Sequence, residues 1–416
     1  MQNTQTSNKV IIIGAGLGGL TLAQGLKKAG ILFHVYERDP TADFRSQGYR
    51  IRIIPEGGEA LKKNLSAEVF SLFERTCAEM IFGESLFNAV DGKVLEDEGI
   101  LPKRQGIPEL LEKAENIVGP FTVDRTTMRN VLLVGLEGNV TFGKEFEKYE
   151  ESEKGVTVHF KDGSKEEAGL LVGADGARSR VRRQYLPESV VVDTDGRAIY
   201  GKTTITKELE ERLPKETMRG ITMLLDKRHE VPLMLFYEAI RFPKDVGTES
   251  NGKVPSVKDY IYWVLFSRKS TLGIEDEELW KLSKEDVKNL SLKFTEDWDP
   301  AFRSLLELQD QDQSAAIRVS SALPDLPFWT PSARVTLLGD AIHVMSPTGG
   351  VGANTALADA AVLCEVIAKG GITAESIGKY EEKMRKFAKR GIEKSYSRAK
   401  KLYGQPPFNE CKRLEF

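Results

Sequence analysis

Residues 9–19 read Lys9-Val-Ile-Ile-Ile-Gly14-Ala-Gly16-Leu-Gly18-Gly19, and this stretch decides the fold. The four apolar residues after Lys9 are typical of a strand that is buried on both faces. The glycines that follow have the G-x-G-x-x-G spacing. Gly14 permits a tight turn, Gly16 allows a pyrophosphate to approach the backbone, and Gly19 lets the next helix pack closely on the strand. The stretch therefore predicts a βαβ unit that binds a dinucleotide.

The residues after the glycines support the same prediction. A helix over residues 17–29 would point its N-terminal N–H groups and its positive dipole end at the phosphates. A second strand over residues 31–36 leads to Glu37, which lies about 20 residues past the glycines, where a ribose hydroxyl needs an acceptor. A βαβ turn that binds nothing is the alternative. The motif alone does not separate FAD from NAD(P).

Composition places the chain among ordinary globular proteins. Its 416 residues are 40% hydrophobic and 29% charged, enough for two or three domains with sizeable cores. The net charge of −3 gives no reason to expect nucleic acid or an anionic membrane as a partner. The three cysteines lack the spacing of a zinc site or a disulfide framework, so no metal is expected. Without a signal peptide pattern or about 18 consecutive apolar residues, the expected location is the cytoplasm.

The pattern of apolar and charged residues changes along the chain. Residues 55–73 read as helical, and residues 139–160 read as a β-meander. From about residue 190 to residue 322, strand-like runs alternate with charged helices and no glycine-phosphate motif occurs. We expect this part to form a separate sheet domain that closes over the ligand of the first domain.

Two further loops follow apolar strands. The first strand, residues 170–172, ends in Gly173-Ala-Asp175-Gly176, and the second, residues 334–338, ends in Gly339-Asp340. In an open parallel sheet such loops share the edge where ligands bind. A carboxylate at Asp340 suits hydroxyl recognition, such as the ribityl chain of a flavin. The glycine-rich residues 347–354 open a long helix, whose dipole suits a flavin ring that becomes anionic on reduction. These loops favour FAD over NAD(P).

At this point the sequence resembles the single-component FAD-dependent aromatic hydroxylases, the monooxygenases related to p-hydroxybenzoate and salicylate hydroxylase. The resemblance is carried by the motif at residues 14–19 with Glu37, by Gly173-Ala-Asp175-Gly176-Ala-Arg178-Ser-x-Val181-Arg182, and by residues 339–354. Residues 45–51 are similar to those of secondary-metabolite members. The resemblance implies an α/β fold: a Rossmann-like FAD-binding domain, an inserted β-sheet substrate domain and a C-terminal helix.

The resemblance also implies domain limits and a cofactor site. The FAD-binding domain would take residues 1–75, 110–190 and 325–370, the substrate domain residues 76–109 and 191–324, and the C-terminal helical region residues 371–416. Asp175 and Arg178 belong to a motif associated with both FAD and NAD(P)H, and Arg125 matches a family arginine that contacts FAD. The implied cofactor-binding residues are Gly14, Gly16, Gly19, Glu37, Arg38, Arg45, Gly48, Arg125, Asp175, Asp340, Gly350, Gly352, Ala353 and Asn354.

The implied function is that of an FAD-dependent monooxygenase in secondary metabolism. NAD(P)H would reduce FAD, O2 would give a flavin C4a-hydroperoxide, and one oxygen atom would pass to an aromatic or polycyclic small molecule by hydroxylation or epoxidation. A Baeyer–Villiger-type insertion is a further outcome, and the chain would act as a monomer or homodimer. The alternatives are a flavin-dependent reductase or dehydrogenase on the same fold, and a non-catalytic flavin-binding protein.

Catalytic side chains are only weakly indicated by the sequence. Arg197 and Tyr200 begin the first strand of the inserted domain, and we name them as candidates for polar roles toward the substrate. Plain sheet packing is the competing interpretation for both. For His343, which lies within the third motif, a structural hydrogen bond is favoured over catalysis.

Overall fold

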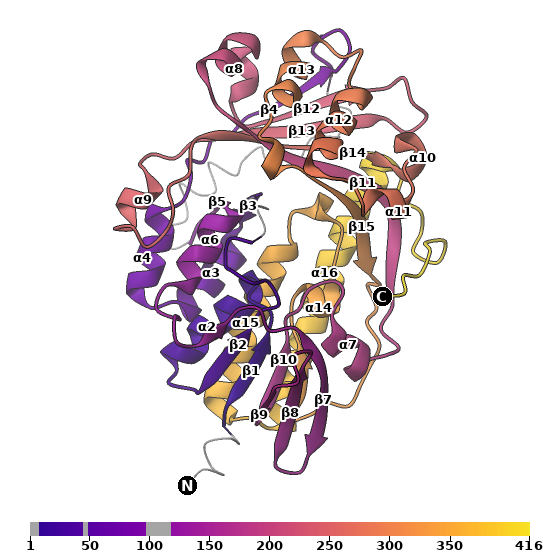
Figure 1. Cartoon of the computed structure of the whole chain (residues 1–416). Coiled ribbons are helices and arrows are strands. Elements are labelled where there is room, and N and C mark those ends of the chain that lie inside the picture. The colour runs from indigo at the N-terminus through magenta and orange to yellow at the C-terminus, as the bar shows by residue number, and fades with distance from the viewer. Residues whose placement is uncertain (1–7, 45–48, 97–117) are drawn as a thin grey trace.

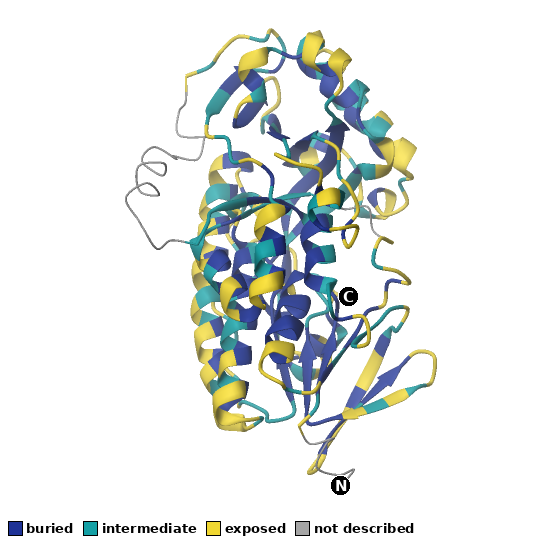
Figure 2. Ribbon diagram, turned by 90° about the vertical axis from the view of Figure 1, so that its left-hand side faces the viewer, coloured by how far each residue is buried: buried dark blue, intermediate teal, exposed yellow. Residues whose placement is uncertain are grey.

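The structure is a computed structural model that describes residues 8–44, 49–96 and 118–416. Figure 1 shows two lobes, one above the other, with the long helix α16 running along the lower lobe and reaching the upper one. Buried strands run through both lobes, and the exposed residues gather on the outer helices and on the lowest hairpin (Figure 2). The predicted α/β fold with a Rossmann-like domain is confirmed.

The lower lobe is built on a parallel sheet. In the described part of the chain this sheet has five strands, all paired in parallel. Their order is β16 (Val335–Leu337), β10 (Leu170–Gly173), β1 (Val10–Ile13), β2 (Phe33–Tyr36) and β6 (Val140–Thr141). Every residue of β1 and β10 is buried, as the apolar runs predict for strands covered on both faces.

Helices and two small sheets surround this central sheet. The helices are α2 (Leu17–Lys28), α3 (Pro55–Asn64), α4 (Ala67–Arg75), α6 (Arg125–Leu133), α7 (Arg180–Tyr185), α14 (Asp340–His343), η3 (Pro347–Gly349), α15 (Gly352–Gly370) and α16 (Ala374–Tyr403). The small sheets are the pair β3 (Arg50–Ile53) and β5 (Phe121–Asp124), and the antiparallel set β7 (Phe146–Ser152), β8 (Gly155–Phe160) and β9 (Lys165–Ala168).

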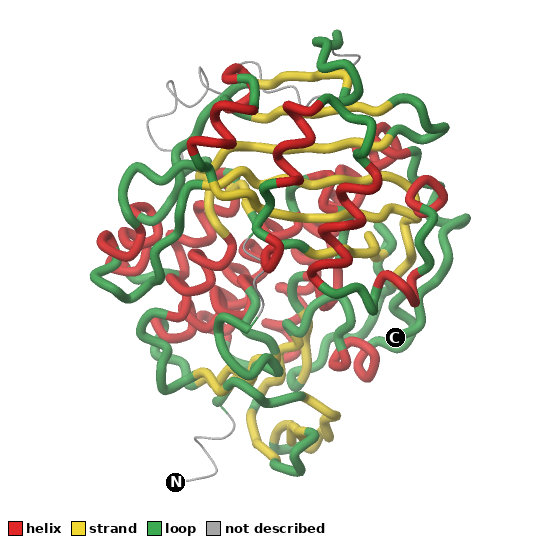
Figure 3. The backbone as a smooth tube through the Cα atoms, turned by 45° about the horizontal axis from the view of Figure 1, so that its top comes forward, coloured by secondary structure: helices red, strands yellow, loops and turns green. Residues whose placement is uncertain are grey.

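The upper lobe is a mixed sheet with helices on its outer face. Its six described strands, in sheet order, are β15 (Ala315–Ala322), β11 (Val191–Thr204), β14 (Tyr260–Arg268), β13 (Leu233–Ile240), β12 (Ile221–Asp226) and β4 (Glu84–Asn88). Helices cross the outer face of this sheet in Figure 3. The helices of this lobe are α8 (Lys207–Arg212), η1 (Lys215–Met218), α10 (Lys269–Leu272), α11 (Asp276–Leu279), α12 (Lys284–Phe294), α13 (Pro300–Glu307) and η2 (Gln311–Gln313). The short helix α9 (Val246–Glu249) instead packs beside α4 of the lower lobe (Figure 1).

Both faces of the upper sheet are covered, and β14 shows how. Its odd-numbered residues, such as Ile261 and Trp263, join the apolar cluster under α12 and α13. Its even-numbered residues, such as Tyr262 and Val264, face the lower lobe and belong to a cluster that includes Tyr403 from the end of α16. This alternation follows from the two-residue period of a strand. It gives the inner face an aromatic surface.

Two local expectations were wrong. The helix expected over residues 55–73 is broken at Leu65, because Ser66 caps a new helix by accepting a hydrogen bond from the N–H of Val69. The β-meander expected over residues 139–160 loses its first strand, since β6 pairs in parallel with β2 and the third antiparallel strand is β9.

Elements of the two lobes alternate along the chain, and the expected domain limits stay a prediction. β11 begins at Val191, β15 ends at Ala322, and β4 joins the upper sheet beside β12. The C-terminal region differs from a simple helical appendage, because Val192 of β11 forms a β-bridge with Arg413 and Tyr403 donates a hydrogen bond to Thr194. The region thus connects both lobes. Residues 97–109 of the expected substrate domain lie outside the described residues.

Candidate cofactor and substrate site

A cavity of about 1410 Å³ lies between the lobes. Residues of the first glycine loop and Glu37 line one part of it, and residues 349–353 line another. The inner face of the upper sheet supplies much of the remaining wall, with Tyr200, Phe236 and Tyr262 among its lining residues. The loops that follow β1, β10 and β16 therefore meet at one edge of the parallel sheet, as the sequence predicts.

The first glycine loop has the geometry that its motif requires. Gly14 has φ +112°, and a Cβ on it would lie 2.3 Å from the carbonyl oxygen of Ala174. A Cβ on Gly19 would lie 2.2 Å from the carbonyl oxygen of Gly14. Gly16, by contrast, has no described heavy atom within 4 Å of that position and lines the cavity. The backbone at Gly16 is thus open to a phosphate at the start of α2, and the site fits a dinucleotide.

The Glu37 carboxylate is tied to the same loop. It accepts hydrogen bonds from the N–H of Ala15 (2.8 Å) and from the N–H of Asp39 (3.0 Å). Sequence reasoning missed Arg129, which lines the cavity, donates a 2.9 Å hydrogen bond from Nε to the carbonyl of Ala15 and lies 3.9 Å from Glu37. Its position one helical turn after Arg125 on α6 was the available signal.

The turn after β16 is held by a buried triad. Gly339 has φ +62° and donates its N–H to Asp359 at 3.0 Å, while Nε2 of His343 lies 2.5 Å from the same carboxylate oxygen. Burial opposes the charged imidazolium, but Asp359 and Asp340 together leave the pKa of His343 raised. The contacts give His343 the structural hydrogen bond that the sequence favoured.

Asp340 itself is exposed to the cavity, directly after this turn. Its position at the foot of the cleft raises the pKa of its carboxyl group by desolvation, and the charges of His343 and Arg125 act in the opposite direction. Arg125 and Asp340 both line the cavity, although they are 215 residues apart in sequence. An acidic group here can accept hydrogen bonds from ligand hydroxyls. Its role toward FAD stays a prediction.

The Asn354 side chain binds the backbone of β3 and the residue that follows it, and the expected contact of Asn354 with FAD stays a prediction. Its Oδ1 accepts a hydrogen bond from the N–H of Ile54 (2.9 Å), and its Nδ2 donates to the carbonyl of Arg52 (2.9 Å). The residue is 3% exposed. The side chain thus fixes β3 against the start of α15, whereas Gly350, Gly352 and Ala353 line the cavity.

Asp175 also serves the fold. Its carboxylate accepts hydrogen bonds from the Ser179 hydroxyl (2.5 Å) and from the N–H of Arg180 (2.8 Å), so it stabilises the start of α7. It lines the cavity too, and burial raises the pKa of its carboxyl group despite these bonds. Arg38 is exposed at the cavity, while Arg45 and Gly48 lie outside the described residues.

The two catalytic candidates lie in the cavity wall, in unlike surroundings. The Arg197 guanidinium is 1% exposed and is bound by Asp193 (2.8 and 2.9 Å) and by Asp276 (2.7 Å). Tyr200 is 5% exposed, and its ring centroid lies 4.6 Å from that of Tyr49. Burial raises the pKa of the Tyr200 phenol, which therefore stays protonated near neutral pH. Catalytic roles for both remain predictions.

A buried ion cluster that the sequence did not indicate joins β3 to the upper sheet. Glu238 of β13 is 2% exposed and pairs with Arg50 and with Arg52, whose Nη2 lies 2.5 Å from it. The Arg50 guanidinium also lies over the rings of Phe236 (5.5 Å) and Tyr262 (5.8 Å). Arg50 and Arg52 stand two residues apart and so share one face of β3, but the sequence alone does not show that Glu238 is their partner.

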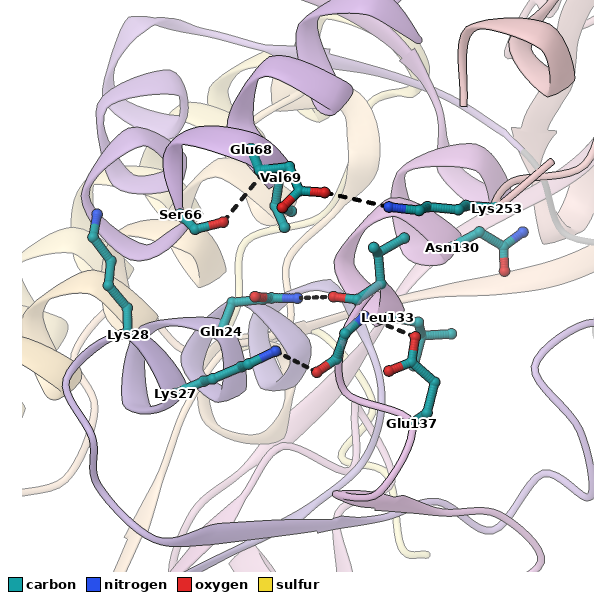
Figure 4. Close-up of a pocket in the computed structure, with 12 residues that line it drawn as sticks. Gln24, Lys27, Lys28, Ser66, Glu68, Val69, Asn130, Leu133, Glu137 and Lys253 are labelled. Carbon is teal, nitrogen blue, oxygen red and sulfur yellow. Dashed lines mark hydrogen bonds and ion pairs between the residues drawn. The ribbon is translucent and has the colours of Figure 1, made fainter. Parts of the chain in front are cut away.

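A smaller hollow of about 580 Å³ lies outside this cleft (Figure 4). Several of its polar side chains have partners within the protein, for example Gln24 with the carbonyl of Leu132 and Lys253 with Glu68. It shares no lining residue with the large cavity. Within the described residues, no group of three side chains that could hold a metal occurs, and no helix is long and apolar enough to cross a bilayer.

Two segments of the chain that contribute to the cleft match known protein families. Residues 12–76 match the NAD(P)-binding Rossmann-like domain family, and residues 330–395 match the FAD binding domain family. The first match contains the glycine loop and Glu37, and the second contains the turn at Asp340 and the second glycine loop. The combination defines an FAD-binding flavoprotein fold.

Individual relatives show which kind of FAD-binding flavoprotein this chain is most similar to. A Photorhabdus luminescens protein assigned as an FAD-containing monooxygenase has a crystal structure that superposes with a TM-score of 0.76 at 30% identity, covering 95% of this chain and 99% of that one. The dual O-methyltransferase/FAD-dependent monooxygenases elcB of Phaeosphaeria nodorum and CTB3 of Cercospora beticola are 39% and 38% identical over 96% and 99% of this chain. The chain belongs to the FAD-dependent monooxygenase family.

The chain spans about half the length of these two fungal relatives, 46% and 48% respectively. Both names combine an O-methyltransferase with a monooxygenase. The similarity therefore covers only about half of each relative, and what the other half does is not carried over to this chain.

Proposed function

We propose that this protein is an FAD-dependent monooxygenase that uses NAD(P)H and O2 to oxygenate an aromatic or polycyclic small molecule. One observation carries the proposal: a single cavity joins the two FAD-type loops to the aromatic inner face of the upper sheet. A substrate on that face would lie against the glycine loop at residues 349–353, where the flavin ring is expected.

The wall of the cavity favours an aromatic substrate. Tyr49, Tyr200 and Tyr262 pack with ring centroids 4.6 to 6.3 Å apart, and Phe236 lies 6.1 Å from Tyr262. Such rings offer flat apolar surface for stacking. Arg50, held by Glu238, adds positive charge beside them. A planar molecule with phenolic or carbonyl oxygens matches both features.

FAD, when bound, supplies the redox and oxygen chemistry, and the protein binds, orients and excludes water. Gly16 and the start of α2 would hold the pyrophosphate, Glu37 the ribose, and Asp340 the ribityl hydroxyls. Gly350, Gly352 and Ala353 would contact the ring, while Asn354 positions β3. Protonated Tyr200 can donate a hydrogen bond to substrate, and water could equally carry the substrate proton.

The fungal relatives support a place in secondary metabolism. Their names pair oxygenation with O-methylation in one chain. A hydroxyl group that oxygenation places on an aromatic ring is an acceptor for a methyl group, so the two reactions are chemically consecutive. We propose the same substrate class here, with the cytosol as location, because the three cysteines are free thiols in the described structure. A monomer or homodimer stays our expectation.

Substrate-dependent NAD(P)H consumption tests the function. A panel of phenols, quinolones and indoles is offered to the FAD-loaded protein, and O2 uptake and product mass are recorded. We expect nucleotide oxidation that depends on substrate and O2, with a product one oxygen heavier. Turnover without O2 would instead establish a reductase or dehydrogenase. Protein that gains no flavin spectrum with added FAD would contradict the family function.

Asp340→Ala tests the cofactor assignment separately. Loss of a charge-assisted hydrogen bond to ligand hydroxyls should weaken FAD binding by about tenfold or more. The measurement is flavin content after gel filtration and FAD affinity by fluorescence quenching. The control is Asp325→Ala, an exposed carboxylate paired with Lys389 outside the cavity lining. Unchanged flavin content in Asp340→Ala would contradict the assignment.

A further inference from the structure

The guanidinium group of Arg50 lies in the aromatic wall of the large cavity and has donors to spare. It lies over the rings of Phe236 (5.5 Å) and Tyr262 (5.8 Å), and the side chain is 10% exposed. Among the described residues it donates a hydrogen bond only from Nη2, to Glu238, and its buried Nε has no acceptor. A guanidinium group has five N–H donors, so these partners leave capacity for a ligand.

The carboxylate that holds Arg50 lies behind it and not at the cavity surface. Glu238 on β13 is 2% exposed and does not line the cavity, whereas Arg50 and Arg52 both line it. Nη2 of Arg52 lies 2.5 Å from Glu238, and Nη1 donates to the Thr122 hydroxyl at 2.5 Å. One carboxylate thus serves two guanidinium groups, and it is their positive charge that faces the cavity.

The neighbouring charged groups do not balance this charge. Asp124 of β5 stands opposite Arg50 in the β3–β5 ladder, but its carboxylate is bound by Lys202 at 2.6 Å. The described ion pairs here therefore join three cations, Arg50, Arg52 and Lys202, to two carboxylates, Glu238 and Asp124. This part of the wall keeps an excess of one positive charge.

The phenols around Arg50 add no negative charge. Burial raises the pKa of the Tyr262 phenol, although the charge of Arg50 acts against this, and burial also raises the pKa of the Tyr49 phenol. Both therefore stay protonated near neutral pH. A positive group in so apolar a wall attracts an anionic oxygen more strongly than it would in water.

Strand β3 is also tied to the loop where the flavin ring is expected. Asn354 at the start of α15 donates to the carbonyl of Arg52 and accepts from the N–H of Ile54, both at 2.9 Å. Arg50 lies two residues before this contact, on the strand at the end of the lower lobe nearest the upper sheet (Figure 1). An oxygen bound by Arg50 would thus have a fixed position relative to the expected flavin site, which orients the ring that carries it.

We propose that Arg50 is a specificity-determining residue that binds an ionised oxygen of the aromatic substrate, either a phenolate or a ring carboxylate. The inference rests on the proposed function, because it takes the ligand of this wall to be the molecule that is oxygenated. Glu238 fixes the orientation of the guanidinium group, and Phe236 and Tyr262 offer flat surface beside it. A planar ring without an ionised oxygen leaves the donors of Arg50 without an acceptor and is selected against.

The test compares anions with neutral molecules of the same shape in FAD-loaded protein without nucleotide. The probes are 4-nitro-1-naphthol, which is ionised near neutral pH, against its methyl ether, and 2-naphthoate against 2-naphthamide. Calorimetry and perturbation of the flavin absorbance give the dissociation constants. We expect native protein to bind at least one anion about tenfold or more tightly than its neutral counterpart. The pair with the larger ratio identifies the ionised group as phenolate or carboxylate.

Three variants assign this preference to a residue. Arg50→Gln removes the charge but leaves Glu238 paired with Arg52, so the buried carboxylate keeps a cation. Arg50→Lys restores the charge. The matched control is Arg241→Gln, because Arg241 directly follows β13, pairs with Glu210 at 2.8 Å and does not line the cavity. Thermal unfolding and FAD content are recorded for each variant.

We expect the anion preference to fall below about threefold in Arg50→Gln through lost anion affinity, with the neutral probes bound as before. Arg50→Lys should keep a preference, and Arg241→Gln should match the native protein. A role in packing alone would instead weaken both probes of a pair equally. Native protein that binds anion and neutral probe alike, or a native-like preference in Arg50→Gln, would overturn the inference. The native ratio and Arg50→Lys decide the matter even where Arg50→Gln does not fold.

Turnover separates this inference from the proposed function. With NAD(P)H and O2, phenols of the substrate panel should be oxygenated in preference to indoles, which carry no ionised oxygen. Indoles oxygenated as efficiently as phenols would overturn the role of Arg50 alone. Anion preference at Arg50 without any O2-dependent product would overturn the proposed function and show that the anion bound there is not a substrate.

Discussion

The two lobes build their shares of the cleft from different parts of the chain. The lower lobe uses backbone: Gly14, Gly16 and the turn at Gly339 bring main-chain groups to the cavity, and side chains such as Glu37 and Asn354 mainly hold that backbone in place. The upper lobe uses side chains, with Tyr200 and Tyr262 on its inner face and Arg197 buried between two carboxylates. The comparison teaches that backbone geometry at glycines shapes the expected cofactor site, whereas side-chain packing shapes the proposed substrate wall.

The largest effect is expected where a glycine is replaced in the lower lobe. In Gly14→Ala the new Cβ would meet the carbonyl of Ala174 at 2.3 Å, and φ is +112°, so the loop between β1 and α2 must shift. We expect protein without detectable flavin, or protein that fails to fold. Flavin absorbance and thermal unfolding measure this outcome.

Gly163→Ala is the matched control. Gly163 also has a positive φ, +83°, in a surface turn, but its Cβ position has no described atom within 4 Å. The alanine at a positive φ should lower the free energy of unfolding by about 1–2 kcal/mol, with flavin content unchanged. Equal flavin loss in both variants would contradict the claim that close approach to Ala174 is decisive.

The next largest effect concerns the contact between the lobes. Lys202 of β11 donates a 2.6 Å hydrogen bond to Asp124, which also accepts from the Tyr260 hydroxyl and from the N–H of Thr127 at the start of α6. Lys202→Met leaves the buried carboxylate without its cation, and removing one member of such a pair typically costs about 3–5 kcal/mol. Urea unfolding measures the loss.

Two further variants make this prediction sharper. Lys202→Met combined with Asp124→Asn removes the charge but keeps a helix cap, so it should recover much of the stability. Lys207→Met breaks an exposed pair with Glu211 and should change stability by less than about 1 kcal/mol. If Lys202→Met changed the free energy of unfolding as little as Lys207→Met, the ion pair between the lobes would not contribute to stability.

A third prediction uses a buried carboxylate of the lower lobe. Glu381 of α16 is 0% exposed, accepts a 2.9 Å hydrogen bond from Thr336, and has its pKa raised by burial to about 7 from an ordinary 4.5. The folded state therefore binds the Glu381 proton more tightly than the unfolded state does. The stability that the protonated carboxyl group contributes is fully present below about pH 4.5 and is lost as the pH rises through about 7.

Glu381→Gln should therefore stabilise the protein by up to about 3 kcal/mol at about pH 8, and by progressively less toward about pH 5. Unfolding curves at both pH values measure the difference. Glu382→Gln, an exposed neighbour that is paired with Lys386, should show no such pH-dependent gain. A gain in Glu381→Gln that is the same at both pH values would exclude titration of Glu381 as its cause.

The smallest effect is expected at Tyr200. Its phenol is protonated near neutral pH, and its ring supplies stacking surface, so Tyr200→Phe should change KM and kcat by less than about threefold. Tyr200→Ala should raise KM by about tenfold through lost packing. A large fall in kcat, or a changed pH profile, in Tyr200→Phe would show that the hydroxyl takes part in catalysis.

The two lobes also differ in what sequence could predict. The glycine spacing, Glu37 and the motif at Asp340 predicted the parallel sheet and the loops at its edge, because these features act through local backbone geometry. From the upper lobe, the sequence named Arg197 and Tyr200, and both line the cavity. The face of β14 that meets the cavity was harder to predict, since residues 260–266 are apolar on both faces and the alternation is hidden. Pairs such as Glu238 with Arg50, and Lys202 with Asp124, join elements far apart in sequence and leave no local signal.

The fate of labelled O2 tests the central claim most directly. The FAD-loaded protein is supplied with NAD(P)H, the panel substrate that best stimulates nucleotide oxidation, and O2 carrying heavy oxygen, and the product is analysed by mass. Our account predicts a product that has gained one heavy oxygen atom, because in the proposed function an aromatic substrate lies against the expected flavin site. A product formed at the same rate without incorporated label would contradict it.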